Sequence, residues 1–350
     1  MNLASIITRI QPLDEAAMHG ATDRQAILTK PRGALGRLET LSIQLAGITG
    51  TTQPRVAHPA IVVAAASHGV AEEGVSAYPA SVTAQMVRNF LSGGAAINVL
   101  ASHAAAKLLV VDAGVADELP THPQLRSVKL AHGTRNIRYE RALPSEHAQQ
   151  IVVAGIELAY ELADAGVDLL ALGEMGIGNT TAAAAIVAAA LHLPPSTVTG
   201  RGTAIDDVRL AHKIEVIEQA LKRHQPKAHD GFELLSTLGG YEIGFLAGCC
   251  LGAAARRVPV VLDGYITGAA ALIAVRIAPL VCSYLIASHR SVEPGHQIVL
   301  QHLELEPLLD LQLRLGEGSG AALALPIVVA AARILNEMAT FAQAGVDDKV

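Results

Sequence analysis

The sequence has very few aromatic residues. Tryptophan is absent, and Phe, Trp and Tyr together make up 3% of the 350 residues. Hydrophobic residues nevertheless account for 51% of the chain and charged residues for 17%, which excludes global disorder. The core must therefore consist of Ala, Val, Leu and Ile, which suits close packing of helices on a sheet. At this length the chain can hold one large α/β domain with a smaller lobe.

Cysteine is also scarce. The chain has three cysteines, Cys249, Cys250 and Cys282, and it contains no CxxC pair. A disulfide framework or a zinc site is therefore not expected. Buried thiols in a reducing compartment are expected instead, which predicts a cytoplasmic protein.

Neither nucleic acid nor a membrane is an expected partner. The net charge of −6 offers no electrostatic attraction to nucleic acid. The N-terminus lacks the apolar run of a signal peptide. Residues 266–287 are hydrophobic enough to consider as a membrane span, but Arg276 and Pro279 interrupt them. A helix followed by a strand is therefore predicted there, and no span.

Short apolar runs alternate with helical segments along the chain. Strands are predicted at 60–66, 107–111, 169–172, 259–262 and 282–287, with another just before Glu317. Such alternation implies a parallel sheet with right-handed crossovers. The predicted strands end in turns that carry Gly and one polar residue each: His68, Asp112, Glu174, Asp263, His289 and Glu317. Because ligands of parallel sheets bind outside the carboxyl ends of the strands, these turns predict a site at one edge of the sheet.

The turn from Gly173 to Thr180 has the G-x-x-x-x-G spacing of a P-loop, but Asn179 stands where that motif requires Lys. The glycines expose backbone N–H groups, and the start of the following helix adds partial positive charge, so the turn suits an anion. Without the lysine, a monophosphate is favoured over a nucleoside triphosphate. Two alternatives remain open: a P-loop-like kinase, and a helix-opening turn that binds nothing.

Glu317 lies between two glycines, ahead of an apolar helix predicted at about 322–343. In a mostly apolar pocket its pKa would rise, which suits a general base near neutral pH. The alternatives are a solvated turn residue and a helix N-cap. The sequence contains no compact set of metal ligands, no dinucleotide fingerprint and no G-x-S-x-G elbow, so neither a metal nor a cofactor is predicted.

Seven stretches, spread in order from residue 30 to residue 326, carry a resemblance to a known family. They are KPRGALGRLE (30–39), HGV…EGVSAYP…VTAQMVRNFLSGGAAINVLA (68–101), GEMGIGNTT (173–181), TGRGT (199–203), PVVLDGYITGAAALIA (259–274), SHRSVEPGH (288–296) and LRLGEGSGAALALP (313–326). The family they resemble is that of the nicotinate-nucleotide–dimethylbenzimidazole phosphoribosyltransferases.

This resemblance implies a fold and an activity. The implied fold is a Rossmann-like α/β domain over residues 56–320, with a mainly parallel six-stranded sheet flanked by helices. A small helical domain would combine residues 1–55 with residues 321–350. The implied activity is the transfer of phosphoribose from nicotinate mononucleotide to 5,6-dimethylbenzimidazole by a homodimer that needs no metal. The products would be α-ribazole 5′-phosphate, a precursor of the cobalamin lower ligand, and nicotinate, with inversion at C1′.

The resemblance also implies roles for individual residues. The catalytic base falls on Glu317 and a second carboxylate on Glu174. The phosphate- and nucleotide-binding positions fall on Gly176, Gly178, Asn179, Gly202, Lys213, Asp263 and Ser291. Proximity to the resembling motifs predicts a benzimidazole pocket made by Tyr78, Ser81, Gln85 and Leu315. The basic loop at 30–37 is predicted to close over a site, either its own or that of a partner subunit. A non-catalytic sensor of nucleotides or corrinoids is the alternative from another class.

Overall fold

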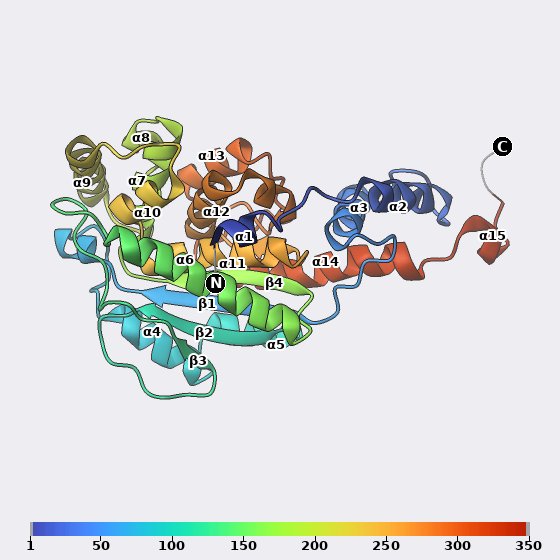
Figure 1. Cartoon of the computed structure of the whole chain (residues 1–350), viewed down its shortest axis with the longest axis horizontal. Helices are drawn as coiled ribbons and strands as arrows, with labels where there is room; N and C mark the ends of the chain where they lie inside the picture. Colours follow the sequence, from blue (N-terminus) through green and yellow to red (C-terminus); the bar gives the residue numbers. More distant parts are fainter. Residues whose placement is uncertain (1–2, 348–350) are drawn as a thin grey trace.

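The computed structural model describes residues 3–347 and is organised around a six-stranded parallel sheet (Figure 1). The strands are β1 (Pro59–Ala66), β2 (Lys107–Gly114), β3 (Leu125–Ser127), β4 (Leu169–Met175), β5 (Val260–Leu262) and β6 (Leu285–Ala287). Their order is β3-β2-β1-β4-β5-β6, and every neighbouring pair is parallel. This is the Rossmann-like order, in which the direction of winding reverses between β1 and β4. The predicted fold class is confirmed.

Two strand predictions are wrong. Within the described residues, no strand directly precedes Glu317, and the nearest pairing is an isolated bridge between His289 and Leu309. The sixth strand is β3, in a region where no strand is predicted from the sequence. It has three residues, includes the exposed Arg126 and pairs only with β2, so it carries no alternating pattern. The run at 282–287 contains β6 but begins as a 3₁₀ helix, η2 (Pro279–Tyr284).

Helices cover both faces of the sheet. One face carries α6 (Ser145–Asp164), α7 (Asn179–Leu191), α10 (Gly231–Leu238), α11 (Tyr241–Ala255) and α12 (Tyr265–Ile277). The other carries α3 (Arg37–Thr49), α4 (Val82–Leu91), α5 (Ala96–His103) and α14 (Ser319–Glu337). Val62 and Ala64 of β1 face the first layer, whereas Ile61 and Val63 face the second. All eight residues of β1 are buried, as expected of a strand covered on both sides.

The remaining helices connect these layers or extend from them. They are α1 (Leu3–Ile7), α2 (Glu15–Ile27), η1 (Gly69–Glu73), α8 (Pro195–Val198), α9 (Asp207–His224), α13 (Pro294–His302) and α15 (Phe341–Ala344). The predicted core of small residues is confirmed where α6 crosses α11. A Cβ added at Gly155 would lie 2.0 Å from the Phe245 carbonyl oxygen, and one at Gly248 would lie 2.0 Å from that of Val152. Only glycine permits this separation of the two helices.

Both ends of the chain build a helical lobe that projects from one end of the molecule (Figure 1). There α2 and α3 pack against each other and against α14. Arg24 of α2 donates hydrogen bonds to the carbonyl oxygens of Asn336 and Met338, at 3.1 and 3.2 Å, and Leu28 bridges to Thr340. The start of the chain departs from the predicted lobe of residues 1–55, because α1 packs on α11 and Ile6 belongs to the core beneath it. Residues 1–2 and 348–350 of the two predicted helical segments lie outside the described residues.

The hydrophobic segment at 266–287 divides into α12, η2 and β6. A different helix, α14, is long and apolar enough to cross a membrane by length and composition alone, with a mean hydropathy of 1.6. Because 56% of that helix window is buried inside the structure, α14 resembles a core helix, which passes the same test.

Candidate active site

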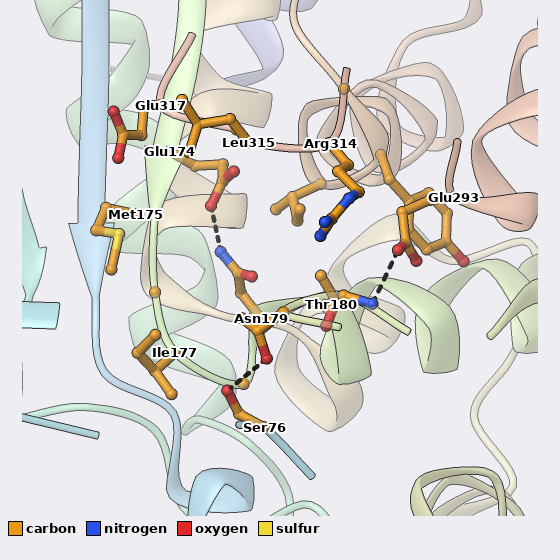
Figure 2. A pocket seen from close by; sticks show the side chains of 18 of the residues that line it. Ser76, Glu174, Met175, Ile177, Asn179, Thr180, Glu293, Arg314, Leu315 and Glu317 are labelled. Atoms are coloured by element: carbon orange, nitrogen blue, oxygen red, sulfur yellow. Dashed lines mark hydrogen bonds between the residues drawn. The ribbon is translucent and has the colours of Figure 1, made fainter. Parts of the chain in front are cut away.

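A cavity of about 530 Å³ lies at the carboxyl ends of β4, β5 and β6 (Figure 2). Its walls come from the turns after these strands, the start of α4 and three loops, at residues 75–78, 202–204 and 314–317. The cavity is therefore on the predicted edge of the sheet, close to the point where the winding reverses. Of the six turn residues predicted to meet there, Glu174, His289 and Glu317 line the cavity.

The other three turn residues have different positions. His68 lies behind the glycine turn, with its Nε2 atom 2.6 Å from the Glu242 carboxylate. Asp263 lies behind the loop that carries Glu317. Asp112 instead forms an ion pair of 3.1 Å with Lys129 beside β2.

The turn after β4 brings Glu174 into contact with the first residue of α7. Gly176 fits there because a Cβ would lie 2.6 Å from the Ala66 carbonyl oxygen, and Gly178 has a left-handed φ of +96°. The side-chain amide of Asn179 donates a hydrogen bond to Glu174 Oε2 (Figure 2). Asn179 therefore orients a carboxylate from the position that a P-loop lysine would occupy.

Glu317 has a backbone conformation that is rare for a residue with a side chain. Its φ is +62°, and its neighbours Gly316 and Gly318 have φ values of +82° and +83°. Close approach to β4 adds a further restriction, because a Cβ at Gly173 would lie 2.4 Å from the Gly318 nitrogen. The Glu317 N–H donates to the Glu174 carbonyl oxygen at 3.2 Å. These contacts hold the loop against the end of the strand that carries the other carboxylate.

Asp263, at the end of β5, holds the same loop from behind. Its Oδ2 accepts the N–H of Gly318 at 3.1 Å, and its Oδ1 accepts those of Gly320 at 2.7 Å and Ala321 at 3.2 Å. Asp263 thus caps α14 and does not line the cavity. Burial raises its pKa to about 7, although the three N–H groups favour the ionised form.

Burial also shifts the two carboxylic acids in the cavity. It raises the pKa of Glu317 to about 7. It raises the pKa of Glu174 to about 8, with a smaller contribution from the charges of Asp263 and Glu242. Glu317 is 5% exposed, and its Oε2 atom has no hydrogen-bond partner among the described residues. A carboxylate with a near-neutral pKa and a free oxygen can accept a proton from a bound molecule.

The opposite wall is organised by Glu293, from the loop after β6. Its Oε1 accepts the N–H of Gly202 at 2.8 Å, and Figure 2 shows Arg314 pointing into the space between this wall and Glu174. Lys213 of α9 is 1% exposed and lies behind the wall, where its Nζ donates to Thr180 Oγ1 at 2.8 Å and to the Gly200 carbonyl oxygen at 3.3 Å. Burial lowers the pKa of Lys213 to about 8, and the charge of Glu293 opposes this shift.

Most of the predicted site residues come together in the cavity wall. The structure places there Tyr78, Glu174, Gly176, Gly178, Asn179, Gly202, Ser291, Leu315 and Glu317. Lys213 and Asp263 lie behind it. Ser81 and Gln85 are not among the residues that line the cavity, whereas their neighbours Val82 and Met86 are. A benzimidazole pocket that includes Ser81 and Gln85 therefore stays a prediction.

Residue spacing gave no signal for Tyr265 and Glu293, which also line the cavity. Each of the two falls within a stretch that carries the family resemblance. In the described part of the chain, no three His, Cys, Asp or Glu side chains are grouped as ligands for a metal ion.

Comparison with known proteins identifies the family. A family model described as a phosphoribosyltransferase matches residues 10–346. A relative from Chloroflexus aurantiacus is 62% identical over 346 residues, 99% of each chain, and one from Desulforudis audaxviator is 51% identical over 344 residues, 98% of each. Both are named nicotinate-nucleotide–dimethylbenzimidazole phosphoribosyltransferase. The chain belongs to this family of pentosyltransferases.

Solved structures agree with this assignment. A crystal structure of CobT from Thermus thermophilus is 47% identical in sequence and superposes with a TM-score of 0.92, covering 95% of this chain and 100% of that one. A second structure from the same organism, titled as the phosphoribosyltransferase itself, is 46% identical with a TM-score of 0.91 and covers 96% of this chain and 100% of that one. The family resemblance read from the sequence is confirmed.

The raised pKa of Glu174 predicts how its replacement changes stability with pH. Between the unperturbed value of 4.5 and about 8, the folded state binds a proton that the unfolded state has lost, so stability falls as pH rises. A Glu174→Gln variant lacks this loss. We expect the free energy of unfolding of the variant minus that of the unaltered protein to be larger at pH 8.5 than at pH 5.5 by about 3 kcal/mol, so that the variant gains relative stability as pH rises.

Urea denaturation at both pH values measures this difference. The exposed Glu118 offers a matched control, since Glu118→Gln removes one carboxylate at the surface and should show no such pH dependence. A Glu174→Gln variant whose relative stability is the same at the two pH values would contradict the assigned shift.

Proposed function

We propose that this cavity transfers the 5-phosphoribosyl group of nicotinate mononucleotide to 5,6-dimethylbenzimidazole, with Glu317 as the general base. Family membership supports the choice of substrates. The observation that carries the mechanism is Glu317 itself: a buried carboxylate with a near-neutral pKa and a free oxygen, held in the cavity wall by an uncommon backbone conformation.

The chemistry requires one base and no acid. The ring nitrogen of the donor is cationic while it is bonded to C1′, and it leaves as a neutral pyridine nitrogen with the bonding electron pair. One nitrogen of the benzimidazole attacks C1′ from the opposite face and forms the new bond. The N–H proton on the other nitrogen passes to the Glu317 carboxylate. Attack from the opposite face converts a β-glycoside into an α-glycoside.

The phosphate is proposed to bind at the glycine turn. Gly176, Gly178 and Asn179 bring the start of α7 to the cavity, where the helix dipole favours an anion. Ser291 and the Arg314 side chain add a hydroxyl and a positive charge from neighbouring loops. Gly202, which has no side chain, leaves room for the phosphate in the same wall. Lys213 and Asp263 act from behind, by holding Thr180 and the Glu317 loop in place.

The benzimidazole is proposed to lie against the apolar part of the wall. Val82 and Met86 from α4 contribute there with Met175 and Leu315, and Tyr78 lies at the rim. These side chains suit a flat methylated ring. Glu174 is proposed to support the base through the shared backbone contact with Glu317 and its hydrogen bond to Asn179.

The proposal further includes a homodimer in the cytoplasm. The family resemblance supports the dimer, and the exposed basic loop around Arg32 is available for contact with a partner. Cys249, Cys250 and Cys282 are free thiols, which suits a reducing compartment.

The direct test mixes the protein with nicotinate mononucleotide and 5,6-dimethylbenzimidazole. We expect release of nicotinate together with a phosphoribosylated benzimidazole, and we expect proton NMR to show the α configuration at C1′. Each substrate alone serves as a control. Binding of both substrates without product would favour the sensor alternative, and calorimetric binding of Mg-ATP would favour the P-loop kinase.

The role of Glu317 predicts the effect of a neutral replacement. Glu317→Gln should lower kcat by about 10²–10⁴-fold, the usual contribution of a positioned base, and leave calorimetric binding of both substrates intact. Substantial transfer should remain above the uncatalysed rate, because holding two reactants in line contributes roughly 7–11 kcal/mol.

The pH dependence of kcat/KM tests the proposed role of Glu317 in a second way. Because the ionised carboxylate is the base, kcat/KM of the unaltered protein should fall as pH falls through about 7, the pKa of Glu317. Glu317→Gln should lose this acid limb, whereas the surface control Glu118→Gln should keep it. Near-normal turnover in Glu317→Gln would assign the base elsewhere, with Glu174 as the next candidate.

A further inference from the structure

His289 is a cavity residue to which neither the family resemblance nor the proposed mechanism assigns a role. It follows β6, is 3% exposed and lines the cavity. Its ring packs against Gly320 of α14 so closely that a Cβ there would lie 1.9 Å from the ring Nδ1 atom. The ring is therefore fixed in orientation by the backbone behind it.

A short hydrogen-bond chain determines which ring nitrogen carries the proton. The Ser288 hydroxyl donates to the Asp263 carbonyl oxygen at 3.1 Å and lies 3.0 Å from His289 Nδ1. Because the Asp263 carbonyl oxygen can only accept, a Ser288 hydroxyl that donates to it accepts from His289, and we infer that the imidazole proton lies on Nδ1. The Asp263 carboxylate, 3.8 Å from Nδ1, favours the same arrangement.

The other ring nitrogen, Nε2, is then a bare acceptor. No residue in the range 3–347 donates a hydrogen bond to it, although the ring forms part of the cavity wall. Burial lowers the pKa of His289 to about 4, so the ring stays neutral at the pH values at which Glu317 is ionised. Such an acceptor can receive a hydrogen bond from an O–H or N–H group of the molecule that fills the cavity.

The position of His289 indicates which part of the donor it meets. Two residues later, Ser291 belongs to the proposed phosphate side. On its other side, the ring contacts Asp263 and Gly320, which hold the Glu317 loop and hence the proposed base. In the donor, the ribose joins the phosphate to the reacting carbon C1′. The ring is therefore placed where the sugar must lie, and the sugar offers hydroxyl donors.

We propose that His289 Nε2 accepts a hydrogen bond from a ribose hydroxyl of the phosphoribosyl donor, and that Ser288 is a positioning residue that keeps this nitrogen unprotonated. The proposal rests on the proposed function and deepens it, by naming the residue that recognises the sugar.

Two substitutions separate the acceptor from the rest of the ring. In His289→Asn the side-chain amide can still reach Ser288, but the Nε2 position is lost. In His289→Gln an amide oxygen can occupy the Nε2 position. We expect His289→Asn to raise the Kd for nicotinate mononucleotide about 10-fold, measured by calorimetry without benzimidazole, and His289→Gln to restore part of the affinity. His103→Asn, at an exposed histidine of α5, is the matched control and should leave Kd unchanged.

Deoxy donors identify the hydroxyl in a double-mutant cycle. The 2′-deoxy and 3′-deoxy forms of nicotinate mononucleotide are titrated into the unaltered protein and into His289→Asn. One of them should bind the unaltered protein about 10-fold more weakly than the parent donor does, and its affinity should not fall further in His289→Asn. The unaltered protein alone keeps this test informative if His289→Asn does not fold.

A spectroscopic test addresses Ser288 directly. Nitrogen-15 NMR of labelled histidine, assigned by comparison with His289→Gln, should show His289 protonated on Nδ1 in the unaltered protein and a mixture of tautomers in Ser288→Ala. Donor binding should weaken in Ser288→Ala to a smaller extent than in His289→Asn.

Three outcomes would overturn the proposal. They are full affinity of the unaltered protein for both deoxy donors, additive losses throughout the cycle, and a proton on Nε2 in the unaltered protein. If transfer of phosphoribose persists alongside any of them, only the assignment of His289 fails. If the unaltered protein neither binds the donor nor transfers its phosphoribosyl group, the proposed function fails as well.

Discussion

The rest of the site depends on the hydrogen bonds that the Asp263 carboxylate accepts. This carboxylate lies at the end of β5 and accepts three backbone N–H groups from the segment that follows Glu317. That segment is also the start of α14, which runs from the sheet into the helical lobe. One side chain therefore fixes the sheet, the proposed base and the helix that reaches the lobe relative to one another. Its burial opposes ionisation and the three N–H groups favour it.

Glycine makes this arrangement sterically possible. Three consecutive residues, 316–318, have left-handed backbone conformations, which cost about 1–2 kcal/mol at a residue with a Cβ. Glycine on either side of Glu317 limits that cost to one position. Gly173 of β4 allows the loop to approach the strand, since a side chain there would overlap the Gly318 nitrogen. The G-E-G sequence and the glycine in β4 thus serve one geometry, although they are far apart in the chain.

Much of the fold and of the candidate site could be predicted from the sequence. Buried strands and glycine turns both leave a local pattern of residue types along the chain. The buried strands, the edge of the sheet that carries the site, and both carboxylates followed from such signals. β3 did not, because three residues on one edge of a sheet carry no period. Nor could the sequence show that Asp263 and Lys213 lie behind the cavity wall, since that depends on which backbone groups reach them. Nor could the sequence show that Val82 and Met86 line the cavity, since the direction of each side chain depends on how α4 packs against the sheet.

The cavity places two carboxylic acids together, and no cation in the range 3–347 is hydrogen-bonded to either, so burial dominates their pKa values. Because burial alone raises the pKa of Glu317 to about 7, a substantial fraction of the carboxylate is ionised near neutral pH and can accept a proton. A lysine or arginine hydrogen-bonded to Glu317 would lower that pKa and make the carboxylate a weaker proton acceptor. The apolar setting of Glu317, without such a partner among the described residues, therefore suits a general base better than an ion pair would.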